Sequence, residues 1–262
     1  MKLILDVENT VTKRDGKMHL DPFEPDNSLV MVGILPVDAD AQPRIYTFDH
    51  AQIEPTFNGK EELQLNLDNT TLLIGHNIAY DLLWLWESGF KYDGEVYDTM
   101  LNEYILQRGV KQPLTLEACA ERCGATPKSD TLKEYFAKGY STRDIPHAEL
   151  CEYLRADLFA TSDVYHSLMR RYNQADNAGL RDIAELTDEV AVCLARIYQR
   201  GFSVDVSKLN EVREEFEKEH EKRLLEPEPD EYTENPQRFH NDVKGTLRPN
   251  MRPYGISTVY RI

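Results

Sequence analysis

The chain has 262 residues, 41% of them hydrophobic and 10% aromatic, which suits a globular protein with one core, or one domain plus an appendage. It contains no long unbroken apolar run of the kind that spans a membrane, and the N-terminus lacks signal-peptide features, so we expect a cytoplasmic protein. The net charge of -16 argues against broad nucleic-acid binding through clustered Lys and Arg. It does not exclude an enzyme in which carboxylates hold cations and the cations hold a phosphate.

Alternating, apolar stretches in the first third of the chain predict the strands that open the fold. They lie at 2–7, 29–35 and 44–48, and we expect them to form an antiparallel meander. The polar stretch 12–28 between the first two is expected to be a long turn.

Further along, the pattern alternates between strand and helix. An apolar strand is expected at 72–75, followed by a helix from His76 or Asn77 to about Ser88, where Gly89 stops it. The other predicted elements are a short strand in 95–100, a helix that stops at Gly109, and helices at 114–123, 128–140 and 149–172. This order predicts an α/β fold with a mixed sheet covered by helices.

After residue 173 the character of the chain changes. A helix with an apolar stripe is expected to end at Gly201, and a highly charged helix follows to about residue 225. Residues 226–262 begin with a proline-rich acidic stretch that is typical of a linker or tail. We therefore expect a domain at 1–175, a helical extension at 176–225 and a tail at 226–262.

Four acidic residues from distant segments, Asp6, Glu8, Asp81 and Asp157, each lie near the end or beginning of a predicted element. With 46 acids in the chain, about eight acid-x-acid pairs arise by chance, so the spacing of Asp6 and Glu8 alone carries little information. Their position carries more, because residues i and i+2 of a strand face the same side. Carboxylates at the end of a buried strand are costly unless they are hydrogen-bonded, exposed or bound to a cation.

The other candidates also have structural interpretations. Asn77 is an ordinary helix N-cap with Asp81 in the first turn, and Tyr153 and Asp157 share a helix face at a common spacing. We expect the nearby aromatic residues, Trp84, Trp86 and Phe90, to pack in the core rather than to stack on bases. Tyr80 is expected to point away from the site.

The four cysteines are not arranged as a zinc site. Cys119 and Cys123 share a helix face, but no second pair of ligands has zinc spacing. Cys151 and Cys193 are single, so we expect four reduced thiols, some of them buried.

The motifs taken together resemble a known family. Asp6-x-Glu8, then Asn77-x-x-x-Asp81, then Tyr153-x-x-x-Asp157 resemble the three motifs of the tyrosine-type DEDD 3′→5′ exonucleases. The histidine type of this family is a poor match, because the position five residues before Asp157, where that type has its histidine, is Glu152. The segments 97–106 and 185–205 resemble the proofreading exonuclease domain of family A DNA polymerases and the helix that follows it, and 19–34 has the character of phage polymerases.

This resemblance implies an RNase H-like fold and a two-metal mechanism. Asp6, Glu8 and Asp157 would hold one Mg²⁺ or Mn²⁺ ion, and Asp6 would bridge to a second that Asp81 reaches directly or through water. Tyr153 would position the attacking water, and Asn77 would contact the terminal nucleotide. The enzyme would release nucleoside 5′-monophosphates from a DNA 3′ end, in proofreading for a family A polymerase.

Two other functions remain open from the sequence. One is an RNA-trimming tyrosine-type exonuclease, since no residue identifiably reads a 2′-hydroxyl. The other is a catalytically idle scaffold for a replication partner. Since the residues after 225 are too few for a polymerase domain, we expect the polymerase in cis within a longer protein or as a separate subunit.

Overall fold

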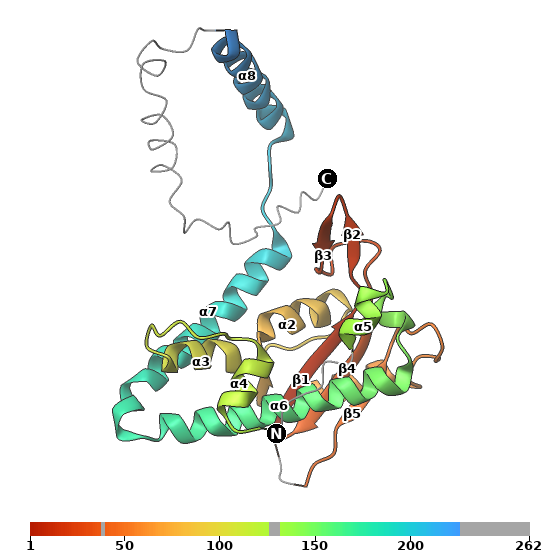
Figure 1. The fold of residues 1–262 in the computed structure, drawn as a ribbon, viewed down its shortest axis with the longest axis vertical. Coiled ribbons are helices and arrows are strands. Elements are labelled where there is room, and N and C mark those ends of the chain that lie inside the picture. The colour runs from red at the N-terminus through yellow and green to blue at the C-terminus, as the bar shows by residue number, and fades with distance from the viewer. Residues whose placement is uncertain (38–39, 126–131, 226–262) are drawn as a thin grey trace. The chain divides into compact units, whose positions relative to one another are not determined.

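The structure is a computed structural model that describes residues 1–37, 40–125 and 132–225 (Figure 1). Its strands are β1 (Lys2–Asn9), β2 (Thr12–Arg14), β3 (Lys17–His19), β4 (Leu29–Pro36), β5 (Arg44–Thr47), β6 (Leu72–Gly75) and β7 (Glu95–Asp98). Its α-helices are α1 (Gly59–Asp68), α2 (Ile78–Glu87), α3 (Thr99–Leu106), α4 (Leu116–Arg122), α5 (Leu132–Ala137), α6 (His147–Tyr172), α7 (Arg181–Arg200) and α8 (Val206–Leu225). Two short 3₁₀ helices, η1 (Thr142–Asp144) and η2 (Ala175–Leu180), flank α6.

Five strands form one mixed sheet in the order β5-β4-β1-β6-β7. The antiparallel meander that the sequence predicts is present, because β1 pairs with β4 and β4 with β5 in antiparallel fashion. Strands β6 and β7 extend the sheet in parallel with β1. Helix α1 precedes β6, and α2 makes the crossover from β6 to β7 that a parallel pair needs. The predicted α/β class with a mixed five-stranded sheet is confirmed.

The side chains of β1 alternate between two cores. Leu3, Leu5 and Val7 pack in a cluster with residues of α1 and α2, whereas Ile4 packs with residues of α6 on the opposite face. The sheet is therefore covered on both faces, and the polar positions of β1 on the α6 side must be accommodated between sheet and helix.

The expected long turn at 12–28 is wrong in its first part, where β2 and β3 pair as a hairpin. The two residues between these strands are Asp15 and Gly16, with φ of 51° and 74°. An Asp-Gly pair with both residues at positive φ matches the tight turn that suits the right-handed twist of a hairpin. The composition of the segment is polar, but the turn chemistry of these two residues decides its structure.

Helix α1 has no counterpart among the predicted elements. Leu63, Leu65 and Leu67 alternate with polar residues, a pattern that resembles a half-buried strand. In the structure Leu63 and Leu67 are buried one helical turn apart, and Leu65 is 62% exposed. The helical spacing of two leucines therefore prevails over the apparent period of two.

The remaining helices lie close to their expected positions. Gly89 and Gly201 follow α2 and α7 with φ of 90° and 62°, as glycines that end helices do. In the predicted helix 128–140, residues 132–137 are helical, and 128–131 lie outside the described residues. The predicted tail 226–262 also lies outside them.

The chain divides into two units at Arg200 and Gly201. Helix α7 belongs to the first unit and packs against α2, α3 and β7. In the second unit, α8 is the charged helix that the sequence predicts. The domain division that we expect at residues 175 and 225 stays a prediction. No helix of the described residues combines the length and apolarity required to cross a membrane.

Aromatic residues after Asp81 belong to the core, as predicted. Trp84, Trp86 and Phe90 are buried in the cluster between the sheet, α1 and α2. The four cysteines are free thiols, of which Cys119 and Cys151 are buried.

Candidate active site

Asp6 and Glu8 lie near the C-terminal end of β1 and face the α6 side of the sheet. Both are half-buried, while Val7 between them is buried in the opposite core. In the register of the sheet, Asp6 lies opposite Gly33 of β4 and Glu8 opposite Met31. The predicted arrangement of two carboxylates on one face of a strand is thus present.

Gly33 lets α6 approach this part of the sheet closely. A Cβ atom at residue 33 would lie 2.8 Å from Leu158 Cδ1 and 2.9 Å from Leu154 Cγ, closer than real Cβ atoms come to other atoms. A glycine in the interior of a strand weakens it, and a frequent reason for one is the close approach of another element. Here the close approach brings the helix that carries Asp157 onto the strand opposite Asp6.

Asp157 completes a cluster with the two acids of β1. Carboxylate oxygens of Asp6, Glu8 and Asp157 lie within 4.8 Å of one another. Asp157 is buried, with 7% of its surface exposed, and the other two are half-buried. Residues that are about 150 positions apart in the chain are brought together because β1 is the central strand and α6 crosses it.

Asp81 reaches the C-terminal end of β1 from the first turn of α2. The pairing of β1 with β6 ends at Ile4 and Ile74, and β1 continues beyond it. The backbone N–H of Val7 donates to Asp81 Oδ1 at 3.1 Å. Burial raises the pKa of Asp81 well above its usual range, and the negative charge of Asp6 raises it further.

Asn77 occupies the N-cap position of α2, as predicted, but its side chain does not cap the helix. Its backbone is left-handed, with φ of 66°, and the residue is exposed. The backbone N–H groups of Asn77 and Ile78 donate instead to the two carboxylate oxygens of Asp98, at 3.1 and 3.0 Å. The interpretation of Asn77 as an ordinary side-chain cap is therefore wrong.

Tyr153 lies one helical turn before Asp157 on α6, so the two side chains share a face of the helix. It is half-buried and packs at the edge of a core cluster that includes Ile145 and Leu150. The sequence analysis leaves Tyr80 outside the site. Its hydroxyl group lies within hydrogen-bond distance of Asn9 Oδ1, at 2.7 Å, and of Leu20 O, at 2.9 Å.

Asp98 is a structural residue of the site that the sequence analysis missed. It is fully buried at the end of β7, and besides the two amides of α2 it accepts the N–H groups of Met100 and Leu101 at 2.9 and 3.1 Å. It therefore caps both α2 and α3. Burial raises its pKa, and the backbone donors oppose that shift. An Asp between an apolar strand and a helix is an N-cap signal that could have found it.

Asp188 of α7 continues this buried network. Its Oδ1 accepts the backbone N–H of Asp98 at 3.2 Å, and Asn102 Nδ2 donates to its Oδ2 at 2.9 Å. Burial raises the pKa of Asp188 to about 7. Nothing in the sequence pattern indicates this contact, because it joins residues 90 positions apart.

The chemistry of the cluster suits a hard divalent cation. Its donors are all carboxylate oxygens, which Mg²⁺ and Mn²⁺ prefer, whereas zinc sites use mainly nitrogen and sulfur. Three carboxylates at this separation repel one another unless a cation or protons compensate their charge. The residues present therefore fit a magnesium or manganese ion.

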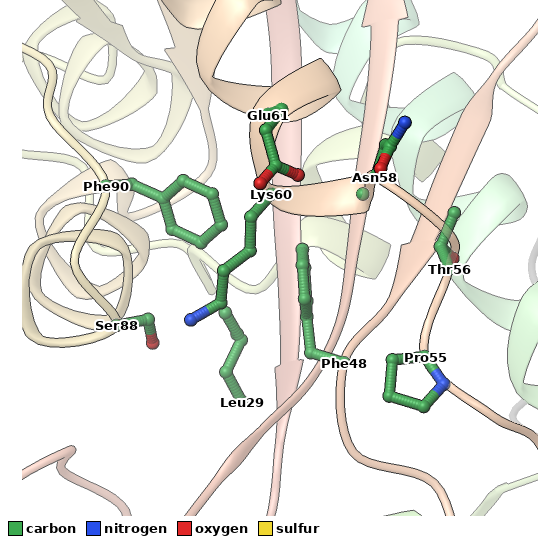
Figure 2. A pocket seen from close by; sticks show the side chains of 10 residues that line it. Leu29, Phe48, Pro55, Thr56, Asn58, Lys60, Glu61, Ser88 and Phe90 are labelled. Carbon is green, nitrogen blue, oxygen red and sulfur yellow. The ribbon is translucent and has the colours of Figure 1, made fainter.

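A cavity next to the sheet lies apart from these acids. It has a volume of about 470 Å³ and is bounded by the start of α1, the end of α2 and the chain after β5 (Figure 2). Leu29, Phe48 and Phe90 form its apolar side, and Lys60 and Glu61 its polar side. None of the predicted site residues lines it, so this cavity is separate from the carboxylate cluster.

No protein-family model matches the chain, and no curated protein matches it in sequence. Solved structures do match its fold. The Brucella melitensis NrnC with bound Mg²⁺ is 18% identical with a TM-score of 0.55, covering 76% of this chain and 86% of that one. The same protein bound to pGG is also 18% identical, with a TM-score of 0.56 over 76% of this chain and 85% of the other.

A polymerase shares the fold as well. The POL domain of Pol1 from M. smegmatis, in complex with a DNA primer-template and dNTP, is 16% identical with a TM-score of 0.54. The match covers 82% of this chain but 31% of that one, so it concerns one part of the polymerase. At 16–18% identity these likenesses concern the fold, and they confirm the RNase H-like fold that the sequence predicts for this chain.

Proposed function

We propose that the protein is a metal-dependent 3′→5′ exonuclease that hydrolyses phosphodiester bonds by a two-metal mechanism. The observation that carries the proposal is the convergence of Asp6, Glu8 and Asp157 within 4.8 Å, from a strand and a helix far apart in the chain. The three acids and Asp81 stand in the order and on the elements that the family resemblance requires. The fold shared with nucleases supports it.

The metal would be held by the acids of the cluster. Asp6, Glu8 and Asp157 would supply ligands to one ion, and Asp6 and Asp81 would reach a second. Such ions supply positive charge to the scissile phosphate and lower the pKa of water. Burial and the charge of Asp6 both raise the pKa of Asp81, and a cation at the cluster would oppose that shift.

The remaining residues would orient the substrate and the water. Tyr153, on the same face of α6 as Asp157, would hold the attacking water by its hydroxyl. Asn77 is exposed at the start of α2, and its side chain is not needed as a cap because Asp98 performs that role. Its amide would contact the terminal nucleotide.

We further propose that the substrate is a DNA 3′ end and the products are nucleoside 5′-monophosphates. Proofreading for a family A polymerase, in cis or as a separate subunit, is the role that we infer for it. The likeness to part of a Pol1 that was solved with a DNA primer-template supports this. So do the sequence segments 97–106 and 185–205, which resemble those enzymes.

A second candidate substrate is a short oligonucleotide, RNA included. The similarity to NrnC favours it, because the structural match extends over 85% of the NrnC chain and that protein was solved bound to pGG. The chemistry at the carboxylates would be the same, so the two candidates differ only in what occupies the site.

The deciding experiment uses DNA and RNA strands of one sequence and two lengths, a dinucleotide and a 20-mer, each labelled at the 5′ end. Each is incubated with the protein in Mg²⁺, Mn²⁺ or EDTA, beside Asp6→Asn and the matched exposed variant Asp26→Asn. We expect a ladder that shortens from the 3′ end, requires the metal, and is lost in Asp6→Asn only.

The outcomes separate the candidates. Faster cleavage of the DNA 20-mer supports proofreading, and preference for the dinucleotide or for RNA supports the second candidate. No cleavage of any strand would reject the enzyme in favour of the idle scaffold. That result would be checked by measuring the melting temperature with and without Mg²⁺, because a scaffold that does not bind the ion is not stabilised by it.

A further inference from the structure

A second cavity of about 410 Å³ lies between α3, α4 and the C-terminal half of α6, away from the carboxylate cluster. Its volume is in the range of about 300–1,000 Å³ that small-molecule sites occupy. It is lined by polar groups that donate hydrogen bonds, Gln107, Gln112, Arg122, Ser167 and Arg171, together with Glu103 and two apolar side chains.

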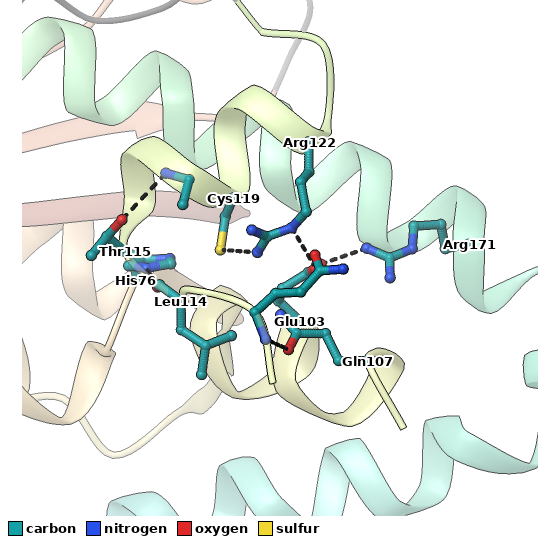
Figure 3. A network of polar contacts seen from close by, with 10 residues as sticks. His76, Glu103, Gln107, Leu114, Thr115, Cys119, Arg122 and Arg171 are labelled. Atoms are coloured by element: carbon teal, nitrogen blue, oxygen red, sulfur yellow. Dashed lines mark hydrogen bonds and ion pairs between the residues drawn. The ribbon is translucent and has the colours of Figure 1, made fainter. Parts of the chain in front are cut away.

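One buried carboxylate and two arginines lie in the wall of this cavity. Glu103 is 2% exposed, and its two oxygens face Arg122 Nε at 3.2 Å and Arg171 Nη1 at 2.5 Å (Figure 3). Together the three side chains carry one net positive charge, in a chain whose net charge is -16. Each guanidinium has five N–H donors, so both retain donors after they contact Glu103.

Gln107 adds a buried donor that lacks an acceptor. The residue is 9% exposed, and its Oε1 accepts the backbone N–H of Gln112 at 3.2 Å. Its Nε2 is buried and has no hydrogen-bond partner among the residues that the structure describes. Buried donors are normally paired, and those that are not call for a missing partner such as a water or a ligand.

We propose that this cavity binds a phosphate group. Arginine side chains recognise phosphate through their planar set of donors, and the excess positive charge and the unpaired amide both favour an anion. The group would belong to a free nucleotide or to a nucleic-acid strand. Arg171 follows Asp157 on α6 by 171 − 157 = 14 residues, or about 21 Å along the helix, so this phosphate is not the scissile one.

The test measures anion binding by the full chain in EDTA at constant ionic strength, where the acidic cluster lacks cations. The probes are inorganic phosphate, AMP, pentathymidylate without a terminal phosphate, and acetate. The variants are Arg171→Gln and its exposed neighbour Arg170→Gln, which change the net charge equally. Gln107→Met is a second test that leaves the ion pairs of Glu103 in place.

We expect Arg171→Gln to weaken binding by at least about tenfold, because a charge-assisted hydrogen bond is lost. The weakened probes are phosphate and AMP if the site binds a free nucleotide, and the oligonucleotide if it binds a strand. Gln107→Met should weaken the same probe, and Arg170→Gln should stay within about twofold of the wild type. A loss confined to the oligonucleotide assigns the site to a strand, and a loss of phosphate and AMP to a free nucleotide. Equal affinities in all variants, or acetate bound as well as phosphate, would overturn the proposal.

Discussion

Two groups of acids in this protein have different surroundings. Asp98 accepts four backbone N–H groups and Asp188 accepts from Asp98 and Asn102, so each charge faces donors. In the cluster at the end of β1, one carboxylate oxygen each of Asp6, Glu8 and Asp157 lies within 4.8 Å of the other two. The first group holds helices in place, and the second brings together carboxylates that could bind a cation.

The two groups of acids are expected to serve different properties, the first the stability of the fold and the second the activity. An acid that satisfies donors is expected to stabilise the fold, and an acid that faces other acids is expected to be retained for a ligand. Substitutions in the two groups should therefore have opposite effects on the two properties.

Asp6→Asn is expected to have the largest effect, and on activity alone. Loss of a shared metal ligand should reduce exonuclease turnover by at least about 10³-fold, measured by release of mononucleotides in Mg²⁺. The melting temperature in EDTA should not fall, since one negative charge of the carboxylate cluster is removed. A variant with near-normal turnover would contradict the metal assignment.

Asp98→Ala is expected to lower the stability of the fold. It removes the caps of α2 and α3 together, so we expect the free energy of unfolding to fall by about 2–4 kcal/mol in urea titration. Asp26→Ala, which removes an exposed acid, serves as the control and should change it by less than about 0.5 kcal/mol. A loss for Asp98→Ala as small as that of the control would refute the capping role.

Gly33→Ala tests whether close packing of α6 builds the cluster. The added Cβ would press on Leu154 and Leu158, which flank Asp157, and should lower the free energy of unfolding by about 1–3 kcal/mol. A displaced Asp157 should also reduce turnover by about 10–10²-fold. Gly179→Ala is the matched control, because nothing lies within 4 Å of its Cβ position. Unchanged turnover in Gly33→Ala would show that the packing does not set the site.

The pH dependence of stability should report on Asp188. Its folded pKa of about 7 lies above the unfolded value near 3.9, so the folded state binds more protons between these values. The contribution of this residue to stability is therefore full below about pH 4 and falls as pH rises to about 7, by up to about 1.4 kcal/mol per pH unit. We expect the difference between wild type and Asp188→Asn in urea titrations to follow this window. A constant difference from pH 4 to pH 8 would contradict the shift.

Much of the molecule follows from the sequence because its signals are local. The apolar runs at 2–7, 29–35 and 72–75 predict strands on their own, and Gly89 and Gly201 mark helix ends because glycine adopts the positive φ found there. The chosen acids were identified by their positions at element ends and by their order. The failures were local as well. The Asp15-Gly16 turn and the buried pair Leu63 and Leu67 were hidden by polar composition and by a misleading alternation.

The contacts between distant elements could not be determined from the sequence alone. Asp6, Glu8 and Asp157 could be proposed as partners, but their separation depends on Gly33, whose missing side chain lets α6 approach. The capping by Asp98, its contact with Asp188 and the charged wall of the second cavity follow no periodicity, because each joins elements far apart in the chain. Local propensity acts within a few residues, whereas burial and hydrogen-bond satisfaction are decided only when the elements pack.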